Sequence, residues 1–208
     1  MKTIFKFALK KLIDGLAPAV PCLWSVPRRR NRIAITFDDG PSSTTPAVLD
    51  ILKSSGTKAT FFVLGNRIGN HPDIVHRIIA EGHEVAIHGY DHTLTRYSRQ
   101  VSRCVGNLSM VGIKPRLIRP PGGRLSGAVL WLWWRGYRTI LFNFDTHDSM
   151  RHEGKWTGAP PDYEAVRGGD IVLMHDDNPM CIAELPVLVR MLQEKGLEAV
   201  TVSGLLQR

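Results

Sequence analysis

Strand-like and helix-like segments alternate along most of this 208-residue chain, and no other feature of the sequence constrains its fold as much. Short apolar runs predict strands at 33–37, 58–64, 84–88, 116–119, 138–144, 170–174 and 198–202. Helical patterns lie between them at 44–54, 71–81, 98–110, 125–135 and 180–195, with a weaker one at 162–167. This alternation predicts an α/β fold with a parallel sheet, either a barrel or an open doubly wound sheet.

Polar clusters stand at or just after the ends of five of the predicted strands. They are Asp38 with Asp39, His88 with His92, Arg119, Asp145 with Asp148, and His175 with Asp176. Barrel enzymes build their active sites from several strands at this carboxyl-terminal rim. The clustering therefore favours the barrel over the open sheet.

The first two clusters predict a metal site. Asp38 and Asp39 are adjacent carboxylates at the end of a buried strand, where ionised groups must be paired or bound to a metal. His88 and His92 add two imidazoles four residues apart. One carboxylate and two imidazoles form an open three-ligand site of the catalytic kind, which leaves the second carboxylate to act as a base. This pattern predicts a metal-dependent hydrolase.

The net charge of +8 is unevenly distributed along the chain. Residues 1–32 contain eight lysines and arginines and one acid, Asp14, whereas the rest of the chain has 19 basic and 18 acidic residues. We therefore expect a basic N-terminal arm at residues 1–30 and a catalytic domain at residues 31–208. The domain has no basic stripe interleaved with aromatic residues, so nucleic acid is not an expected partner.

The arm has neither a membrane span of about 18 apolar residues nor a clear signal peptide. We therefore expect a cytoplasmic location. The arm's apolar face would consist of Ile4, Phe5, Ala8, Leu9, Leu12 and Leu16, opposite Lys6, Lys10 and Lys11. This pattern predicts either a helix peripheral to the inner membrane, with Trp24 and the arginines at 28–30 near the head groups, or a short helix that covers the base of the domain.

Five motifs in this order resemble those of carbohydrate esterase family 4, the NodB-homology polysaccharide deacetylases. The motifs are Thr36-Phe37-Asp38-Asp39-Gly40, His88-Gly89-Tyr90-Asp91-His92, Arg119-Pro120-Pro121-Gly122-Gly123, Phe144-Asp145-Thr146-His147-Asp148-Ser149 and Ile171-Val172-Leu173-Met174-His175-Asp176. The resemblance covers roughly residues 32–203. It implies a distorted (β/α)7 barrel, which agrees with the seven predicted strands, and hydrolysis of acetyl groups on sugars.

The resemblance also implies roles for the first two motifs and for Arg119. Asp38 would be the general base, held by the guanidinium of Arg119. Asp39, His88 and His92 would bind a divalent ion, for which we expect Zn²⁺ with Co²⁺ or Ni²⁺ as alternatives.

The remaining motifs supply the oxyanion donor, the acyl pocket and the general acid. The Gly122 N–H would stabilise the oxyanion, and Leu173 would line the pocket for the acetyl methyl group. His175, oriented by Asp148, would protonate the leaving nitrogen.

Three positions depart from the family pattern: Gly89 replaces a Ser or Thr, Gly122 an aromatic residue and Ser149 a Trp. These changes predict a less aromatic substrate pocket and a missing or replaced hydrogen bond near His92. We assign a structural role to His147 and expect at least one of Trp131, Trp133 and Trp134 to pack in the core.

The expected activity is metal-dependent removal of N-acetyl groups from an acetamido sugar in a poly- or oligosaccharide, so the expected partner is an acetylated glycan. One alternative is a deacylase or deformylase of a lipid-linked sugar at the membrane surface, which the basic arm and the absent Trp motivate. Another is an inactive carbohydrate-binding domain, which the five filled motifs disfavour.

Overall fold

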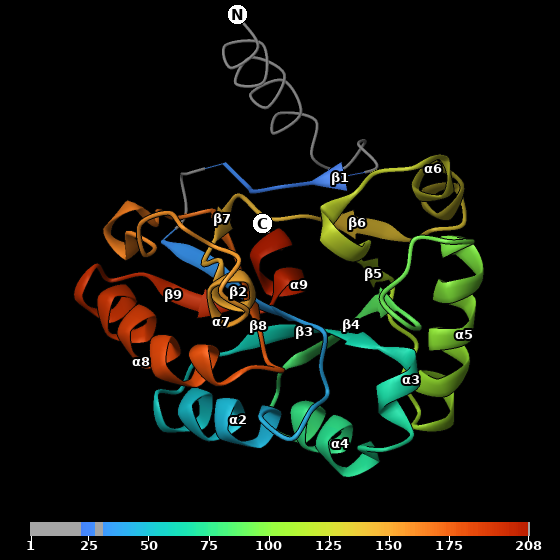
Figure 1. Ribbon diagram of the computed structural model, residues 1–208, viewed down its shortest axis with the longest axis horizontal. Helices are drawn as coiled ribbons and strands as arrows, with labels where there is room; N and C mark the ends of the chain where they lie inside the picture. The colour runs from blue at the N-terminus through green and yellow to red at the C-terminus, as the bar shows by residue number, and fades with distance from the viewer. Residues whose placement is uncertain (1–21, 28–30, 208) are drawn as a thin grey trace, which may run out of the picture.

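The computed structural model describes residues 22–27 and 31–207, and Figure 1 shows how their helices and strands are arranged. All neighbouring strands pair in parallel, in the order β1-β6-β5-β4-β3-β2-β8-β7, and β9 also pairs with β2. The strands are β1 (Cys22–Leu23), β2 (Arg32–Asp38), β3 (Ala59–Leu64), β4 (Glu84–Gly89), β5 (Leu117–Ile118), β6 (Arg138–Ile140), β7 (Phe144–Asp145), β8 (Ile171–His175) and β9 (Glu198–Val200).

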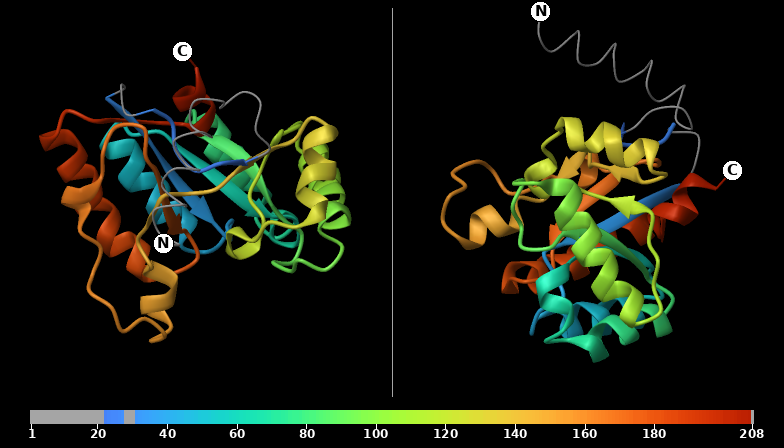
Figure 2. Two further views of the ribbon diagram at one scale, coloured as in Figure 1. Left: turned by 90° about the horizontal axis from the view of Figure 1, so that it is seen from above. Right: turned by 90° about the vertical axis from the view of Figure 1, so that its right-hand side faces the viewer.

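Helices cover the outside of this curled sheet, as the two views in Figure 2 show. They are α2 (Thr45–Ser54), α3 (Gly65–Ile68), α4 (Pro72–Ala80), α5 (Tyr97–Met110), α6 (Gly127–Trp134), α7 (Asp148–His152) and α8 (Pro179–Glu194). The last helix, α9 (Val202–Leu206), instead packs Val202 and Leu205 against the inner face of the sheet. Two 3₁₀ turns, η1 (Pro121–Gly123) and η2 (Tyr163–Ala165), complete the described elements. The predicted distorted barrel is confirmed.

The predicted strand at 138–144 is wrong in one respect, because it is two short strands at opposite ends of the sheet. β6 pairs with β5 and β1, whereas β7 pairs with β8. Between them, the Leu141 N–H donates to the carbonyl of Leu23 and the Asn143 N–H to that of Ile171. Three residues thus cross from one end of the sheet to the other, and so short a connection requires the sheet to curl until its ends are close.

The pleat of the strands separates an outer core from an inner one. Ile33, Ile35 and Phe37 of β2 belong to the large outer cluster that packs against the helices. Ala34 belongs to a smaller inner cluster, which Val202 of α9 joins. Since both faces of β2 are buried, its sequence is an apolar run rather than an alternating one.

The inward-facing positions along these strands lead to the predicted site residues. His88 lies two residues after the inner residue Ala86, and Arg119 lies two residues after the inner residue Leu117. Asp38 and His175 lie four residues after the inner residues Ala34 and Ile171. Because every pairing is parallel, these strand ends share one rim. The fold thus brings residues far apart in sequence to one end of the barrel.

The N-terminal arm falls almost entirely outside the described residues, so its helix and its membrane contact stay predictions. Cys22 and Leu23, within the predicted arm, form β1 at the edge of the same sheet. The division between arm and domain at residues 30 and 31 stays a prediction. Within the described ranges, no helix has the length and apolarity required to cross a bilayer.

Candidate metal centre and catalytic residues

Asp39, His88 and His92 come together at the rim. One potential ligand atom from each lies within 4.8 Å of the others. Asp39 Oδ1 is 3.5 Å from His88 Nε2 and 3.4 Å from His92 Nε2. Asp39 and His92 both have left-handed backbone conformations, with φ of 72° and 60°, which turn the chain sharply after β2 and β4. The three predicted ligands therefore converge on one point.

The chemistry of these three side chains fits a bound cation. Asp39 Oδ1 is buried and has no hydrogen-bond partner, an arrangement that is unfavourable unless the oxygen binds something else. His88 Nδ1 lies 2.9 Å from the Arg119 carbonyl oxygen. That oxygen can only accept, so Nδ1 carries the proton and the lone pair of Nε2 points toward Asp39.

Burial also keeps His88 in the form that binds metals. Desolvation lowers the pKa of His88 and outweighs the opposing charges of Asp38 and Asp39, so the ring is neutral near pH 7. A neutral imidazole nitrogen, a carboxylate oxygen and a second imidazole at an accessible edge form an open three-ligand site. Which ion binds stays a prediction.

Asp38 is held beside this group by Arg119. Arg119 Nη1 donates to Asp38 Oδ1 over 2.7 Å and to Thr36 Oγ1 over 2.8 Å. Its other nitrogens donate to the carbonyls of Ile140 and Leu141. Burial lowers the pKa of the fully buried Arg119, and the charge of Asp38 opposes this effect. The pair compensates both buried charges, and it leaves Asp38 Oδ2 outside the ion pair.

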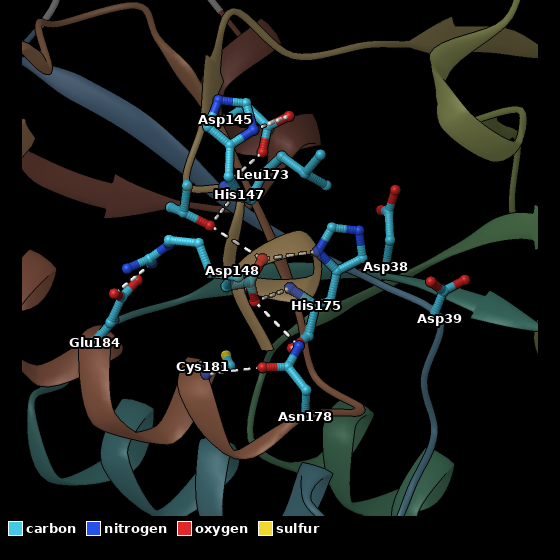
Figure 3. A network of polar contacts seen from close by, with 12 residues as sticks. Asp38, Asp39, Asp145, His147, Asp148, Leu173, His175, Asn178, Cys181 and Glu184 are labelled. Atoms are coloured by element: carbon cyan, nitrogen blue, oxygen red, sulfur yellow. Dashed lines mark hydrogen bonds and ion pairs between the residues drawn. The ribbon is translucent and has the colours of Figure 1, made fainter. Parts of the chain in front are cut away.

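Across the rim, Asp148 orients His175 (Figure 3). His175 Nδ1 lies 2.8 Å from Asp148 Oδ1, and the His175 backbone N–H donates to Oδ2 over 2.8 Å. Burial would lower the pKa of His175, but the hydrogen bond and charge of Asp148, with Asp38 and Asp39, raise it to about 9. The ring therefore holds a proton at neutral pH, and Nε2 is its second donor.

Asn178 completes this pair and was not predicted. Its Nδ2 donates to Asp148 Oδ2 over 3.3 Å and to the His175 carbonyl over 3.1 Å. Its Oδ1 accepts the Cys181 N–H and caps α8. An Asn directly before a Pro that opens a helical pattern is a recognisable N-cap signal.

Asp176, adjacent to His175, supports the turn that carries Asp39. Thr45 Oγ1 donates to Asp176 Oδ2 over 2.6 Å, and the Asp176 N–H donates to the Asp38 carbonyl over 3.3 Å. A Cβ at Gly40 would lie 2.3 Å from Oδ2, so this position requires glycine. Burial raises the pKa of Asp176 to about 7, with smaller contributions from Asp177 and Asp39.

Leu173 and Gly122 have settings compatible with their expected roles. Leu173 is buried on β8, two residues from His175 on the same face, and Figure 3 shows it beside the polar network. Gly122 is exposed in η1 with φ of 60°. The turn is closed by the Gly123 N–H, which donates to Pro120, rather than by the Gly122 N–H.

The aromatic predictions need one correction. None of Trp131, Trp133 and Trp134 packs in the core, because Val129 and Leu132 already fill the buried side of α6. His147 has an aromatic partner that was not predicted: Trp156 stacks on its ring with 3.7 Å between centroids. The motif at residues 144–149, in which Ser149 replaces the Trp of the family pattern, thus has an aromatic residue packed against it.

Comparisons with known proteins show which family this chain resembles. A family model described as polysaccharide deacetylase matches residues 25–133. A peptidoglycan-N-acetylglucosamine deacetylase of Bacillus cereus is 35% identical, over 92% of this chain and 96% of that protein. The deacetylase PgdA of Listeria monocytogenes is 38% identical over 86% of this chain, which spans only 39% of the Listeria protein.

Solved structures share the fold. The Bc1960 peptidoglycan N-acetylglucosamine deacetylase, crystallised with 4-naphthalen-1-yl-N-oxidanyl-benzamide, superposes with a TM-score of 0.79 at 27% identity, covering 92% of this chain and 95% of that one. A family 4 pseudoenzyme from Bacillus anthracis superposes with a TM-score of 0.78 at 22% identity, covering 92% and 71%. The second likeness concerns the fold alone, so activity has to be argued from the side chains.

Proposed function

The chain belongs to the polysaccharide deacetylase family, and from this premise we propose that it is a metal-dependent hydrolase that removes N-acetyl groups from the acetamido sugars of a glycan. The observation that carries the metal dependence is the buried Asp39 Oδ1, which has no hydrogen-bond partner and faces the Nε2 atoms of His88 and His92.

Asp39, His88 and His92 are the residues that would hold the ion. When bound, a divalent ion there would polarise the acetyl carbonyl and lower the pKa of a water molecule. Asp38 accepts the proton of the attacking water, because the hydrogen bond from Arg119 fixes the orientation of its carboxylate. The Gly122 N–H is assigned to the oxyanion that develops on the carbonyl.

His175 completes the reaction as the general acid. Its raised pKa, about 9, keeps the ring protonated at neutral pH. Asp148 accepts from Nδ1, so Nε2–H is the group that gives its proton to the departing sugar nitrogen. The carbon–nitrogen bond breaks and acetate leaves, while the proton taken by Asp38 balances the one given by His175.

The substrate we propose is a glycan that contains N-acetylglucosamine. Several relatives are named peptidoglycan-N-acetylglucosamine deacetylases and another a chitin deacetylase, although one is a bifunctional xylanase/deacetylase. Action on a lipid-linked sugar and a cytoplasmic location remain untested predictions.

The test is acetate release from a panel that contains peptidoglycan, chitooligosaccharides, O-acetylated xylan and a lipid-linked acetamido sugar. We expect release from an N-acetylated glycan that is lost after chelation and restored by Zn²⁺, Co²⁺ or Ni²⁺. Release unaffected by chelation would contradict metal dependence. No release from any substrate by metal-loaded protein would instead support the inactive carbohydrate-binding alternative.

A further inference from the structure

Helix α6 is apolar on all sides although it lies on the surface. Only Val129 and Leu132 are fully buried among its residues. Its other large side chains are exposed to solvent: Leu130 by 58%, Trp131 by 44%, Trp133 by 43% and Trp134 by 78%, and Leu125 just before the helix by 51%. We call these five residues the α6 surface. A helix that is hydrophobic all round is normally buried in protein or lipid.

The segment that contains α6 carries one sign of charge. Residues 92–144 have nine lysines and arginines and no acid, whereas the rest of the chain from residue 33 has ten basic and 18 acidic residues. One of the nine, Arg119, is buried and paired with Asp38, which leaves eight. The near neutrality of the domain thus conceals a strong asymmetry. Because α5 and α6 pack against each other, this basic segment forms a continuous part of the fold, at the right of Figure 1.

Basic side chains flank the α6 surface directly. Arg124 precedes α6 and Arg135 follows it, and both are exposed. The Arg135 guanidinium lies 5.1 Å from the centre of the Trp131 ring. Among the described residues, no ion pair joins Arg124 or Arg135 to an acid. The tryptophans are therefore bordered by cations that are available to an anionic partner.

Strand β1, where the described part of the chain begins, lies beside this helix. Cys22 of β1 packs with Val129 of α6, and Trp24 packs against the same small cluster. Residues 1–21, which precede β1, contain four lysines and one acid. The like charge of this segment and of the arginines around α6 disfavours its docking on the α6 surface. It favours a common anionic partner for both.

The side chains distinguish a lipid partner from a polysaccharide. Leu125 and Leu130 project aliphatic groups that offer no flat face for a sugar ring, whereas aliphatic groups enter the acyl region of a bilayer. Tryptophans are enriched at the boundary between acyl chains and head groups, and arginines bind lipid phosphates. We propose that the α6 surface is a docking site for an anionic phospholipid bilayer.

This assignment also brings the rim near the bilayer. Leu125 follows shortly after Gly122, in the loop that leads from the rim to α6. A bilayer on the α6 surface would therefore lie close to the active site and present membrane-proximal glycan to it. The inference concerns attachment and stands apart from the chemistry of the rim.

Vesicle flotation of the full chain tests the proposal. Vesicles of phosphatidylcholine alone are compared with an equimolar mixture of phosphatidylcholine and phosphatidylglycerol. We expect binding to the mixed vesicles and about tenfold weaker binding of the double variant Leu130→Ser/Trp134→Ser, because two inserted apolar side chains are lost. The variant Arg124→Gln/Arg135→Gln should also bind at least about fivefold more weakly.

The matched control is Ile79→Ser/Val187→Ser, which removes exposed apolar side chains from α4 and α8. This control should bind as the wild type does. Equal binding by all variants would overturn the proposal and leave the arm as the lipid contact. Weak vesicle binding together with a dimer that Leu130→Ser/Trp134→Ser dissociates would also overturn it, since the surface would then join two copies of the chain. Preference for a soluble anionic polysaccharide over the vesicles would overturn it in favour of a glycan site.

Discussion

The rim at the ends of β2, β4 and β8 and the α6 surface differ in how completely their groups are satisfied by the rest of the protein. At the rim, Asp38 is paired with Arg119 and Asp148 with His175, while Asp39 Oδ1 is left without a hydrogen-bond partner. On the α6 surface, large apolar side chains are left in water. In each region the unsatisfied group is the observation on which a proposed partner rests, a metal ion at the rim and an anionic bilayer at the α6 surface.

The difference also separates chemistry from attachment. The rim holds its groups with buried, charge-assisted hydrogen bonds, which fix geometry to the accuracy that catalysis needs. The α6 surface positions no reacting group, and attachment to a bilayer requires only apolar area and positive charge. Changes at the rim should therefore lower turnover, whereas changes on α6 should leave turnover intact.

The largest effect should follow the loss of a metal ligand. In His88→Ala, one of three ligands is removed, and we expect acetate release to fall by more than about a thousandfold together with the loss of bound metal. The measurement is acetate release alongside metal content by mass spectrometry. His76→Ala, at an exposed position on α4, is the control and should retain both properties. Full activity in His88→Ala would remove the rim as the metal site.

A smaller effect should follow the loss of the base. We expect Asp38→Asn to retain the metal but to lose about 10²- to 10⁴-fold in kcat. Its unfolding free energy should also fall by about 3 to 5 kcal/mol, because Arg119 would be left as an uncompensated buried charge. Turnover is measured at a temperature where circular dichroism shows the variant folded. Asp73→Asn, on the exposed part of α4, should change neither quantity.

A third change separates the general acid from its support. In Asp148→Asn the charge that raises the pKa of His175 is lost, so the alkaline limb of the activity profile, which we expect near pH 9 in the wild type, should move to lower pH. The turnover at neutral pH should fall by about 10- to 100-fold. An unmoved alkaline limb would show that His175 is not the group that titrates.

The pH dependence of stability in the metal-free protein is a second test of the Asp148–His175 pair. The folded-state pKa of His175 lies above its unfolded value of 6.5, so the resulting stabilisation is complete below pH 6.5 and is lost as the pH rises through about 9. Denaturant titrations should show that the wild type has a higher unfolding free energy than Asp148→Asn at pH 6. This difference should be up to about 3 kcal/mol larger at pH 6 than at pH 10. A difference that does not change with pH would contradict the assignment.

The smallest effect on turnover should come from the α6 surface. Leu130→Ser/Trp134→Ser changes two side chains that are mostly exposed, so its unfolding free energy should stay within about 0.5 kcal/mol of the wild type. Its turnover of a soluble chitooligosaccharide should also be unchanged. If turnover fell with the rim intact, the separation of chemistry from attachment would be wrong.

The parts that the sequence predicted depend on local patterns. Strands β2, β3, β4 and β8 are largely apolar because both of their faces are buried, and the ends of β2, β4 and β8 carry polar residues of the motifs. Parallel pairing then places these ends at one rim whatever the details of the loops. For this reason, the convergence of Asp39, His88 and His92 could be predicted before their geometry was seen.

The parts that were missed depend on distant contacts. The crossing between β6 and β7 is decided by pairing with β1 and β8, which no local pattern at 138–144 reveals. The role of Asn178 depends on Asp148, which lies 30 residues away in sequence. The exposure of the α6 tryptophans likewise could not be inferred, because the sequence of an exposed apolar helix looks the same as that of a buried one.

The most direct test of the account is a crystal structure of the zinc-loaded protein with anomalous scattering measured at the zinc edge. We predict one peak at about 2.0 to 2.2 Å from Asp39 Oδ1, His88 Nε2 and His92 Nε2, with Asp38 outside the coordination sphere and still bound to Arg119. A peak elsewhere, or an ion bound by Asp38 instead of Asp39, would contradict it.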